Sequence, residues 1–158
     1  MQILVVYHSR TGNTKKVAEA VADGVKKEGA TCVLKPVSEV TNDDFLLSEG
    51  IIAGSPVYFG SMASEMKAVF DNLVKVRSKM GDKVGAAFAT SADSSGGKET
   101  TIFSIIQAML ICGMIVVGDP LDATGHYGVA CVGAPDEKTL QHARKLGKRV
   151  ALLVKRIQ

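Results

Sequence analysis

A short run rich in hydroxyl side chains and glycine, residues 8–14, has the composition of a loop that binds an anion. It follows an apolar run at 3–7 and precedes a segment at 15–27 whose apolar residues recur at helical spacing. A loop between a strand and a helix gathers unpaired backbone N–H groups at the helix N-terminus, where the macrodipole favours negative charge. The pattern predicts that this first loop binds a phosphate group, with Ser9, Arg10, Thr11, Gly12, Asn13 and Thr14 as its candidate contacts.

Other interpretations of the first loop compete with phosphate binding. The glycine spacing of a dinucleotide fingerprint is missing from it, and so is a Gly-Lys-Ser/Thr ending. A turn followed by a helix cap would also use threonine, glycine and asparagine here, without any ligand. Arg10 either offsets phosphate charge or faces solvent. Three hydroxyl groups after an apolar strand favour the phosphate interpretation.

The surrounding segments predict a parallel sheet with helices on both faces, because apolar runs alternate with amphipathic ones. Strands are expected at 3–7, 31–34, 50–54, 84–90 and 114–117, with one more extended piece near 129–132. Helices are expected at about 14–27, 62–73, 99–112 and 136–157, with a short helical turn at 41–47. A chain of 158 residues is expected to form a single domain, 1–158.

Two further loops, at 55–61 and 91–97, follow predicted strands at the edge where open parallel sheets bind ligands. The second loop offers aromatic surface to a flat ring, and the third offers backbone N–H groups among small polar residues. A ligand with an anion at one end and a polar-edged ring at the other would contact all three loops, and an isoalloxazine with a ribityl phosphate tail has this form. The candidate contacts are Pro56, Val57, Tyr58, Phe59 and Gly60 in the second loop and Ser91, Ala92, Asp93, Ser94, Ser95 and Gly96 in the third.

Several other chemistries do not fit the sequence. The third loop continues into Gly97-Lys98 as a P-loop would, but Ala92 and Glu99 replace its first glycine and its metal-binding hydroxyl. No Gly-x-Ser-x-Gly nucleophile motif occurs, and no group of histidine, cysteine and carboxylate has metal-ligand spacing. Neither an ATPase, nor a hydrolase of that type, nor a metal site is therefore expected.

Composition bears on the protein's partners and on the cellular compartment expected for it. The net charge is +3, and the basic residues near the C-terminus are expected to form a solvated helix face without interleaved aromatics, not a nucleic-acid site. No apolar run is long enough to span a bilayer, and the first strand starts too early for a signal peptide. Three widely spaced cysteines are expected to be small core residues in a reducing, cytoplasmic setting.

Four stretches, 9–14, 54–62, 91–101 and 126–128, together resemble the flavodoxin-like superfamily. Within it, the chain resembles the Trp-repressor-binding-protein type of NAD(P)H:quinone oxidoreductase, nearly from end to end. The resemblance implies a flavodoxin-like three-layer α/β/α sandwich with a five-stranded parallel sheet in the order 2-1-3-4-5. It also implies that the first loop holds the phosphate of FMN, the second borders the flavin ring and the third contacts the pyrimidine edge.

Three departures from that type concern the acceptor pocket. A histidine that borders the flavin in the turn after the third long helix is replaced by Cys112. A tryptophan of the family's substrate pocket has no counterpart, because the chain contains none. The segment between the second and third strands is also shorter than usual. The resemblance further implies a homodimer or homotetramer, for which methionine-containing faces of two helices are candidate contacts.

The leading functional hypothesis is an enzyme that transfers two electrons from NAD(P)H to a quinone or similar acceptor. The third loop has no aromatic side chain to cover one ring face, and the slight basic charge differs from that of acidic electron carriers. His126 and Tyr127 either contact the quinone or only pack the late loop, and Asp93 would lower the flavin potential if it faces the ring. The alternatives are a flavodoxin-type FMN electron carrier acting with protein redox partners, and a flavin-free interaction module.

Overall fold

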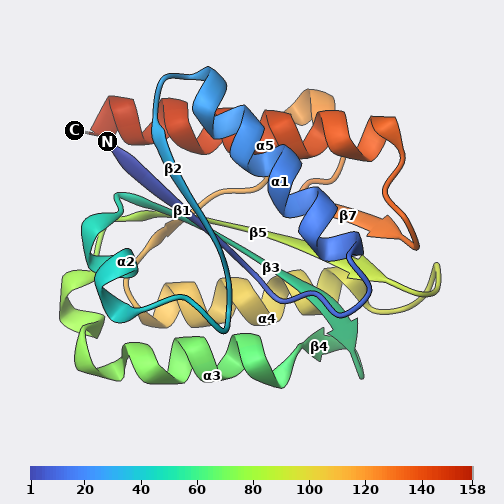
Figure 1. Cartoon of the computed structure of the whole chain (residues 1–158), viewed down its shortest axis with the longest axis horizontal. Coiled ribbons are helices and arrows are strands. Elements are labelled where there is room, and N and C mark those ends of the chain that lie inside the picture. The colour runs from blue at the N-terminus through green and yellow to red at the C-terminus, as the bar shows by residue number, and fades with distance from the viewer. Residues whose placement is uncertain (158) are drawn as a thin grey trace.

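A computed structural model describes residues 1–157, in which a central sheet lies between two layers of helices (Figure 1). The main strands pair in parallel, in the order β2-β1-β3-β5-β6. Their bounds are β1 (Gln2–Tyr7), β2 (Thr31–Pro36), β3 (Gly50–Tyr58), β5 (Val84–Ser91) and β6 (Ile115–Val116). The predicted three-layer sandwich and the strand order 2-1-3-4-5 are thereby confirmed.

The fifth position of the sheet is made of two short strands. β6 pairs with the start of β5, whereas β7 (Val129–Val132) pairs with its end, from Phe88 to Ser91. Between them the chain leaves the sheet and forms a short 3₁₀ turn, η3 (Leu121–Ala123). The extended piece predicted near 129–132 is confirmed, and the structure adds that it continues the edge strand at the height where β5 ends.

Two helices cover each face of the sheet (Figure 1). α1 (Asn13–Lys27) and α5 (Glu137–Ile157) pack on one face, and α3 (Ser64–Asn72) and α4 (Lys98–Ile111) pack on the other. Two 3₁₀ turns, η1 (Leu73–Lys75) and η2 (Arg77–Lys79), follow α3. The predicted helices are confirmed with small shifts of their ends, except that Met62 lies in the short strand β4 (Ser61–Met62) before α3.

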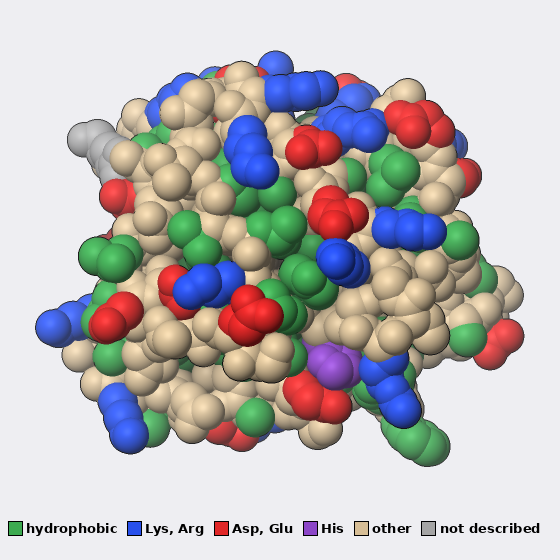
Figure 2. Space-filling model, viewed as in Figure 1, with side chains coloured by type: hydrophobic (Ala, Val, Ile, Leu, Met, Phe, Trp, Pro, Cys, Tyr) green, Lys and Arg blue, Asp and Glu red, His purple; other side chains and the backbone are tan. Residues whose placement is uncertain are grey.

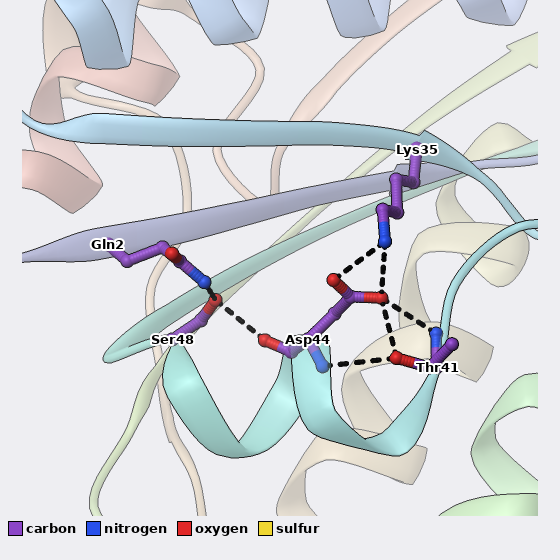
Figure 3. A network of polar contacts seen from close by, with 5 residues as sticks. All are labelled: Gln2, Lys35, Thr41, Asp44 and Ser48. Atoms are coloured by element: carbon purple, nitrogen blue, oxygen red, sulfur yellow. Dashed lines mark hydrogen bonds and ion pairs between the residues drawn. The ribbon is translucent and has the colours of Figure 1, made fainter.

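The short helix α2 (Asn42–Leu47) is fixed to the edge of the sheet by polar contacts (Figure 3). Thr41 caps it by accepting from the Asp44 N–H, and the Asp44 carboxylate accepts in return from the Thr41 N–H. Lys35 donates to both Asp44 carboxylate oxygens at 2.8 Å, and Gln2 donates to Ser48 at 3.1 Å. Burial acts to raise the pKa of Asp44, but the hydrogen bonds from Lys35 and Thr41 outweigh it and lower that pKa. This short helix is thereby held against β1 and β2.

Two glycines allow α1 and α5 to pack with their backbones in close contact. A Cβ atom on Gly24 would lie 2.0 Å from the Arg144 carbonyl oxygen, and one on Gly147 would lie 2.1 Å from the Val21 carbonyl oxygen. Each glycine therefore faces the backbone of the opposite helix, which cannot move aside as a flexible side chain can. The close approach buries Val21, Val25 and their neighbours over β1.

Replacing Gly147 with alanine is expected to reduce the free energy of unfolding by about 1–3 kcal/mol or more, because the added methyl group forces the two helices apart. Urea denaturation measures this loss. Gly81→Ala is the matched control, since a Cβ atom there would meet nothing within 4 Å. Equal stability of the Gly147 and Gly81 variants would show that the helices can separate without loss of packing.

None of the helices within residues 1–157 combines the length and the apolar character that crossing a bilayer would require. The predicted use of methionine-containing helix faces in assembly is wrong. Met66 and Met109 are fully buried in the core between the sheet and helices α3 and α4, so neither is available to another chain.

Candidate functional site

The three loops predicted to share a ligand meet at the carboxyl edge of the sheet, because β1, β3 and β5 are neighbouring parallel strands. The ring of His8 in the first loop contacts Tyr58, with centroids 6.2 Å apart. The Thr14 hydroxyl lies 2.9 Å from that of Thr90, which precedes the third loop. A Cβ atom on Gly97 would lie 3.0 Å from the Cα atom of Gly60. The second loop thus contacts each of the other two, and the first loop contacts the strand that leads into the third.

The helix that follows the first loop begins without a side-chain cap. Gly12 occupies the N-cap position with φ of 93°, and no side chain hydrogen-bonds there. The first turn of the helix contains no acidic residue. Lys16 N–H donates to the Gly12 carbonyl at 3.0 Å, so the N–H groups of residues 13–15 precede the helical ladder. A turn that existed only to cap the helix would offer these groups a side-chain acceptor, and capping of this kind is absent from the start of α1, where no side chain caps the helix.

The side chains of the first loop divide into two groups. Ser9 accepts a hydrogen bond from the Gly12 N–H at 3.1 Å, which closes the loop, while Arg10 and Thr11 are exposed. Thr14 is 2 % exposed, and its hydroxyl is bonded to Thr90 in the interior. Thr14 therefore fixes the start of α1 against β5, and the exposed position of Arg10 fits its solvent-facing interpretation.

The second loop, predicted at 55–61, is a β-hairpin in the structure, and this corrects the expected end of the strand. β3 continues to Tyr58 because its residues Ser55 and Pro56 still pair with β5, and β4 then returns antiparallel to it. Phe59 and Gly60 form the turn, with φ of 49° and 77°. Two positive φ values suit the twist of a two-residue hairpin, for which Asn-Gly is favoured. A phenylalanine at the first of these positions is unusual, and its side chain is entirely exposed.

Two serines that the sequence did not identify position this hairpin. The buried Ser55 hydroxyl accepts from the Ala63 N–H at 2.8 Å and donates to the Pro56 carbonyl at 2.8 Å. Ser104 on α4 accepts from the Met62 N–H at 3.1 Å. The signal for Ser55 in the sequence is its position directly after an apolar run, where a hydroxyl that becomes buried requires a partner.

The Ser55→Ala variant is expected to lose about 1–3 kcal/mol of stability, because the buried Ala63 N–H would lose its acceptor. A thermal melt monitored by circular dichroism would report the loss. Ser78→Ala removes an exposed hydroxyl from η2 and serves as the control. A Ser55 variant as stable as the Ser78 variant would mean that water replaces the hydroxyl at no cost.

The third loop is a turn closed on its own backbone. The carbonyl oxygen of Asp93 accepts from the Ser91 hydroxyl at 2.7 Å and from the Gly96 N–H at 3.1 Å. Gly97, with φ of 91°, is the N-cap of α4 and again has no side-chain cap. The side chain of Asp93 is exposed, so its predicted effect on a ring stays a prediction. A second uncapped helix N-terminus therefore lies at the same edge as the first.

The late-loop residues lie apart from this edge. The ring of Tyr127 packs on Phe103 of α4, with centroids 4.6 Å apart, and His126 is exposed. The next residue, Gly128, approaches Ala87, four positions before Ser91 on β5. His126 and Tyr127 thus lie beside the middle of β5, and their contact with an acceptor stays a prediction.

Cys112 lies at the opposite edge of the sheet, which corrects its expected place beside a flavin. It ends α4, and the next residue, Gly113, accepts from the Asp82 N–H just before β5 begins. α4 runs antiparallel to the strands, so its last residue lies far from the three loops. Burial raises the pKa of the Cys112 thiol, and it raises those of Cys32 and Cys131 to about 11. None of these thiols has the low pKa of a nucleophile.

Within residues 1–157, no three or more histidine, cysteine or carboxylate side chains lie close enough together to hold a metal ion. The site contains two helix N-termini without side-chain caps, each with a glycine in the left-handed conformation. A hairpin with aromatic side chains lies between them. Such a site suits an anion attached to a flat ring.

Solved structures define the class of protein to which this fold and site belong. An archaeal flavodoxin aligns with a TM-score of 0.85 and 29 % identity, covering 98 % of this chain and 99 % of its own. A WrbA-like flavodoxin from Agrobacterium tumefaciens aligns with a TM-score of 0.87 and 27 % identity, covering 99 % of each chain. The chain has a flavodoxin-like fold.

Sequence comparison then gives the family. Residues 43–127 match the family described as NADPH-dependent FMN reductase. A protein of Archaeoglobus fulgidus named NAD(P)H dehydrogenase (quinone) is 36 % identical, covering 99 % of this chain and 98 % of its own. A protein of Aquifex aeolicus named flavodoxin is 37 % identical, covering 95 % of this chain and 85 % of its own. The chain belongs to the NADPH-dependent FMN reductase family, which confirms the resemblance found in the sequence.

Proposed function

We propose that this protein binds FMN at the carboxyl edge of its sheet and transfers two electrons from NAD(P)H to a quinone or similar acceptor. The observation that carries the proposal is the meeting of three loops beside two uncapped helix N-termini. Relatives named NAD(P)H dehydrogenase (quinone), from Archaeoglobus fulgidus and from Azorhizobium caulinodans at 34 % identity, support the reaction class.

The residues present fit FMN. Its phosphate would be held by the free N–H groups of residues 13–15 and by the hydroxyls of Ser9 and Thr11, where the helix dipole favours a dianion. Tyr58, on the hairpin between the other two loops, would border the ring. Backbone N–H groups within residues 91–95 would donate to the polar edge of the ring, while the Gly96 N–H is bonded to the Asp93 carbonyl.

Bound FMN supplies hydride acceptance from a reduced nicotinamide and electron donation to an acceptor. The chain binds and orients the cofactor and leaves one face of the site uncovered, because the third loop has no aromatic side chain. No protein acid or base is required for hydride transfer to a flavin. Acceptor contact by His126 and Tyr127, which lie beside the middle of β5 and apart from the three loops, stays a prediction beside the alternative that they only pack the late loop.

A flavodoxin-type electron carrier is the second candidate, favoured by relatives that bear that name in Aquifex aeolicus and Clostridium saccharobutylicum. A carrier would accept electrons from a partner protein and not directly from NAD(P)H. The fully exposed Phe59 at the hairpin tip would then contact that partner.

Two measurements separate these functions. An absorption spectrum of the purified protein with added FMN tests cofactor binding. If the protein shows no bound flavin, the flavin-free interaction module is the one hypothesis that still stands. Steady-state turnover with NADH or NADPH and a benzoquinone tests the enzyme. We expect a rate well above that of free FMN. A rate equal to that of free FMN would reject the enzyme and favour the electron carrier.

We further propose that the protein acts in the cytoplasm as a homodimer or homotetramer. In support of assembly, the structure exposes several large apolar side chains: Phe59, Phe103, Leu110, Ile111 and Tyr127. Phe59 stands out among them, because nothing covers it and its backbone conformation is a strained one for phenylalanine. Such strain is typical of sites that contact a ligand or a partner.

A further inference from the structure

His8 lies where the first loop, the hairpin and α3 meet. It directly follows β1, and its N–H donates to the Gly54 carbonyl at 3.0 Å. Its side chain is 13 % exposed and stands edge-on to Tyr58, with ring centroids 6.2 Å apart and an interplanar angle of 74°. Ser9, the first candidate phosphate contact, is its neighbour in the chain. A change at the imidazole therefore acts on both ends of the proposed cofactor site.

The imidazole Nε2 atom is buried and lacks a hydrogen-bond partner within residues 1–157. The nearest carboxylate oxygen, Glu65 Oε1 on α3, is 3.7 Å away, which is within range of an ion pair but too long for a hydrogen bond. A buried polar atom without a hydrogen bond destabilises the structure. A protonated Nε2 atom would therefore be expected to move into hydrogen-bond distance of the Glu65 carboxylate. Imidazole is the side chain whose charge ordinarily changes between pH 5 and 8.

Glu65 is suited to accept a hydrogen bond from a protonated His8. Hydrogen bonds from its own backbone N–H and from the Ser64 hydroxyl lower the pKa of Glu65, and the charges of His8 and Arg10 add to the effect. The carboxylate is thus ionised throughout the range in which an imidazole titrates. An ionised acceptor lies beside an unpartnered nitrogen, and a small rotation of either side chain would complete the bond.

The other charges around His8 come from the first loop and from α1. A pocket of about 460 Å³ beside the loop is lined by Arg10, Lys15 and Glu65 as well as His8. Residues 36–38, at the end of β2 and in the turn after it, line the pocket without a charge. Tyr7 of β1 and Tyr58 of β3 are the other titratable groups near His8. In the view of Figure 2, a histidine side chain reaches the surface with acidic and basic side chains next to it. Among the residues that the structure describes, Glu65 is therefore the one anion that lines this pocket with His8.

We propose that His8 is a positioning residue whose protonation closes an ion pair with Glu65 and so strengthens FMN binding at low pH relative to a protein that lacks the pair. The pair would connect the first loop to α3 and hold Tyr58 in place. The inference rests on the proposed function, since it concerns the same cofactor. FMN binding and protonation of the imidazole then favour each other, so the pair adds affinity at low pH and adds none at high pH.

The test is the dissociation constant of FMN, measured by quenching of its fluorescence at pH 6 and at pH 8.5. For each protein we take the ratio of the dissociation constant at pH 8.5 to that at pH 6 and compare this ratio between wild type and variants. Ionisation of the free cofactor changes the ratio equally in all of them. We expect the wild-type ratio to exceed that of His8→Gln by about two- to fivefold, which is the range that one partly exposed ion pair contributes. Glu65→Gln should show the same reduced ratio as His8→Gln.

Matched controls separate the pair from general charge effects. His142→Gln removes a histidine from α5, and Asp71→Asn removes an exposed carboxylate of α3 that pairs with Lys67 at 2.6 Å. Both should keep the wild-type ratio. A wild-type ratio in His8→Gln or in Glu65→Gln would overturn the inference. Glu65 is half exposed, so its variant gives a result even if the His8 variant does not fold. Wild-type protein that does not bind FMN at either pH would instead refute the proposed function.

Discussion

Replacing Thr11 with aspartate is expected to weaken FMN binding about 100-fold or more while leaving the fold unchanged. Thr11 is exposed and lies between Arg10 and the left-handed Gly12, in the middle of the first loop. A carboxylate there would lie beside the phosphate, and two like charges a few ångströms apart near a protein surface repel by about 4 kcal/mol. Titration of FMN fluorescence against wild-type and variant protein measures the change.

Two comparisons make the Thr11 prediction specific. Riboflavin, which lacks the phosphate, should bind to both proteins with similar affinity. Thr11→Asn, which adds no charge, should lose much less FMN affinity than Thr11→Asp. Equal FMN affinity of Thr11→Asp and wild type would place the phosphate elsewhere, and an equal loss of riboflavin affinity would indicate a general disturbance of the edge.

The first and third loops could be located from the sequence because their function depends on local chemistry. Hydroxyls and glycines directly after an apolar β-branched run predict both the loop and the helix that follows, and parallel strands place such loops on one edge. The structure agrees, since Gly12 and Gly97 take the left-handed conformation at the two helix starts. The absence of side-chain caps there was not predictable, because Ser9, Thr11 and Thr14 are all residue types that cap helices.

What the sequence did not predict depends on contacts between distant segments. The run 55–58 resembles a loop in the sequence because it holds Pro56. In the structure β3 continues through it, because residues 55 and 56 pair with β5 and residues 57 and 58 pair with β4. The position of Cys112 follows from the direction in which α4 crosses the sheet, which no local pattern records. The contact of His8 with Glu65 joins residues 57 positions apart, and only the packing of α3 beside β1 brings them together.

Replacing Phe59 with asparagine is expected to abolish or strongly reduce assembly and to leave the stability of the single chain equal or higher. Phe59 is fully exposed and has φ of 49°, so it contributes no packing within its own chain and strains the hairpin turn. Asn-Gly is the favoured pair for two left-handed turn positions, so an asparagine directly before Gly60 should relieve that strain by about 0.5–1.5 kcal/mol. Because Phe59 gains no packing within its own chain, we expect its ring to contact another chain.

Light scattering at micromolar concentration reports the assembly, and urea denaturation reports the stability of the Phe59→Asn variant. Leu47→Asn is the control, because Leu47 is also exposed but ends α2 on the edge of the sheet, away from the hairpin. Assembly of the Phe59 variant equal to that of wild type would exclude the hairpin tip from the subunit contact. Loss of assembly with FMN affinity retained would show that the three loops form the cofactor site within one chain and that Phe59 serves contacts between chains.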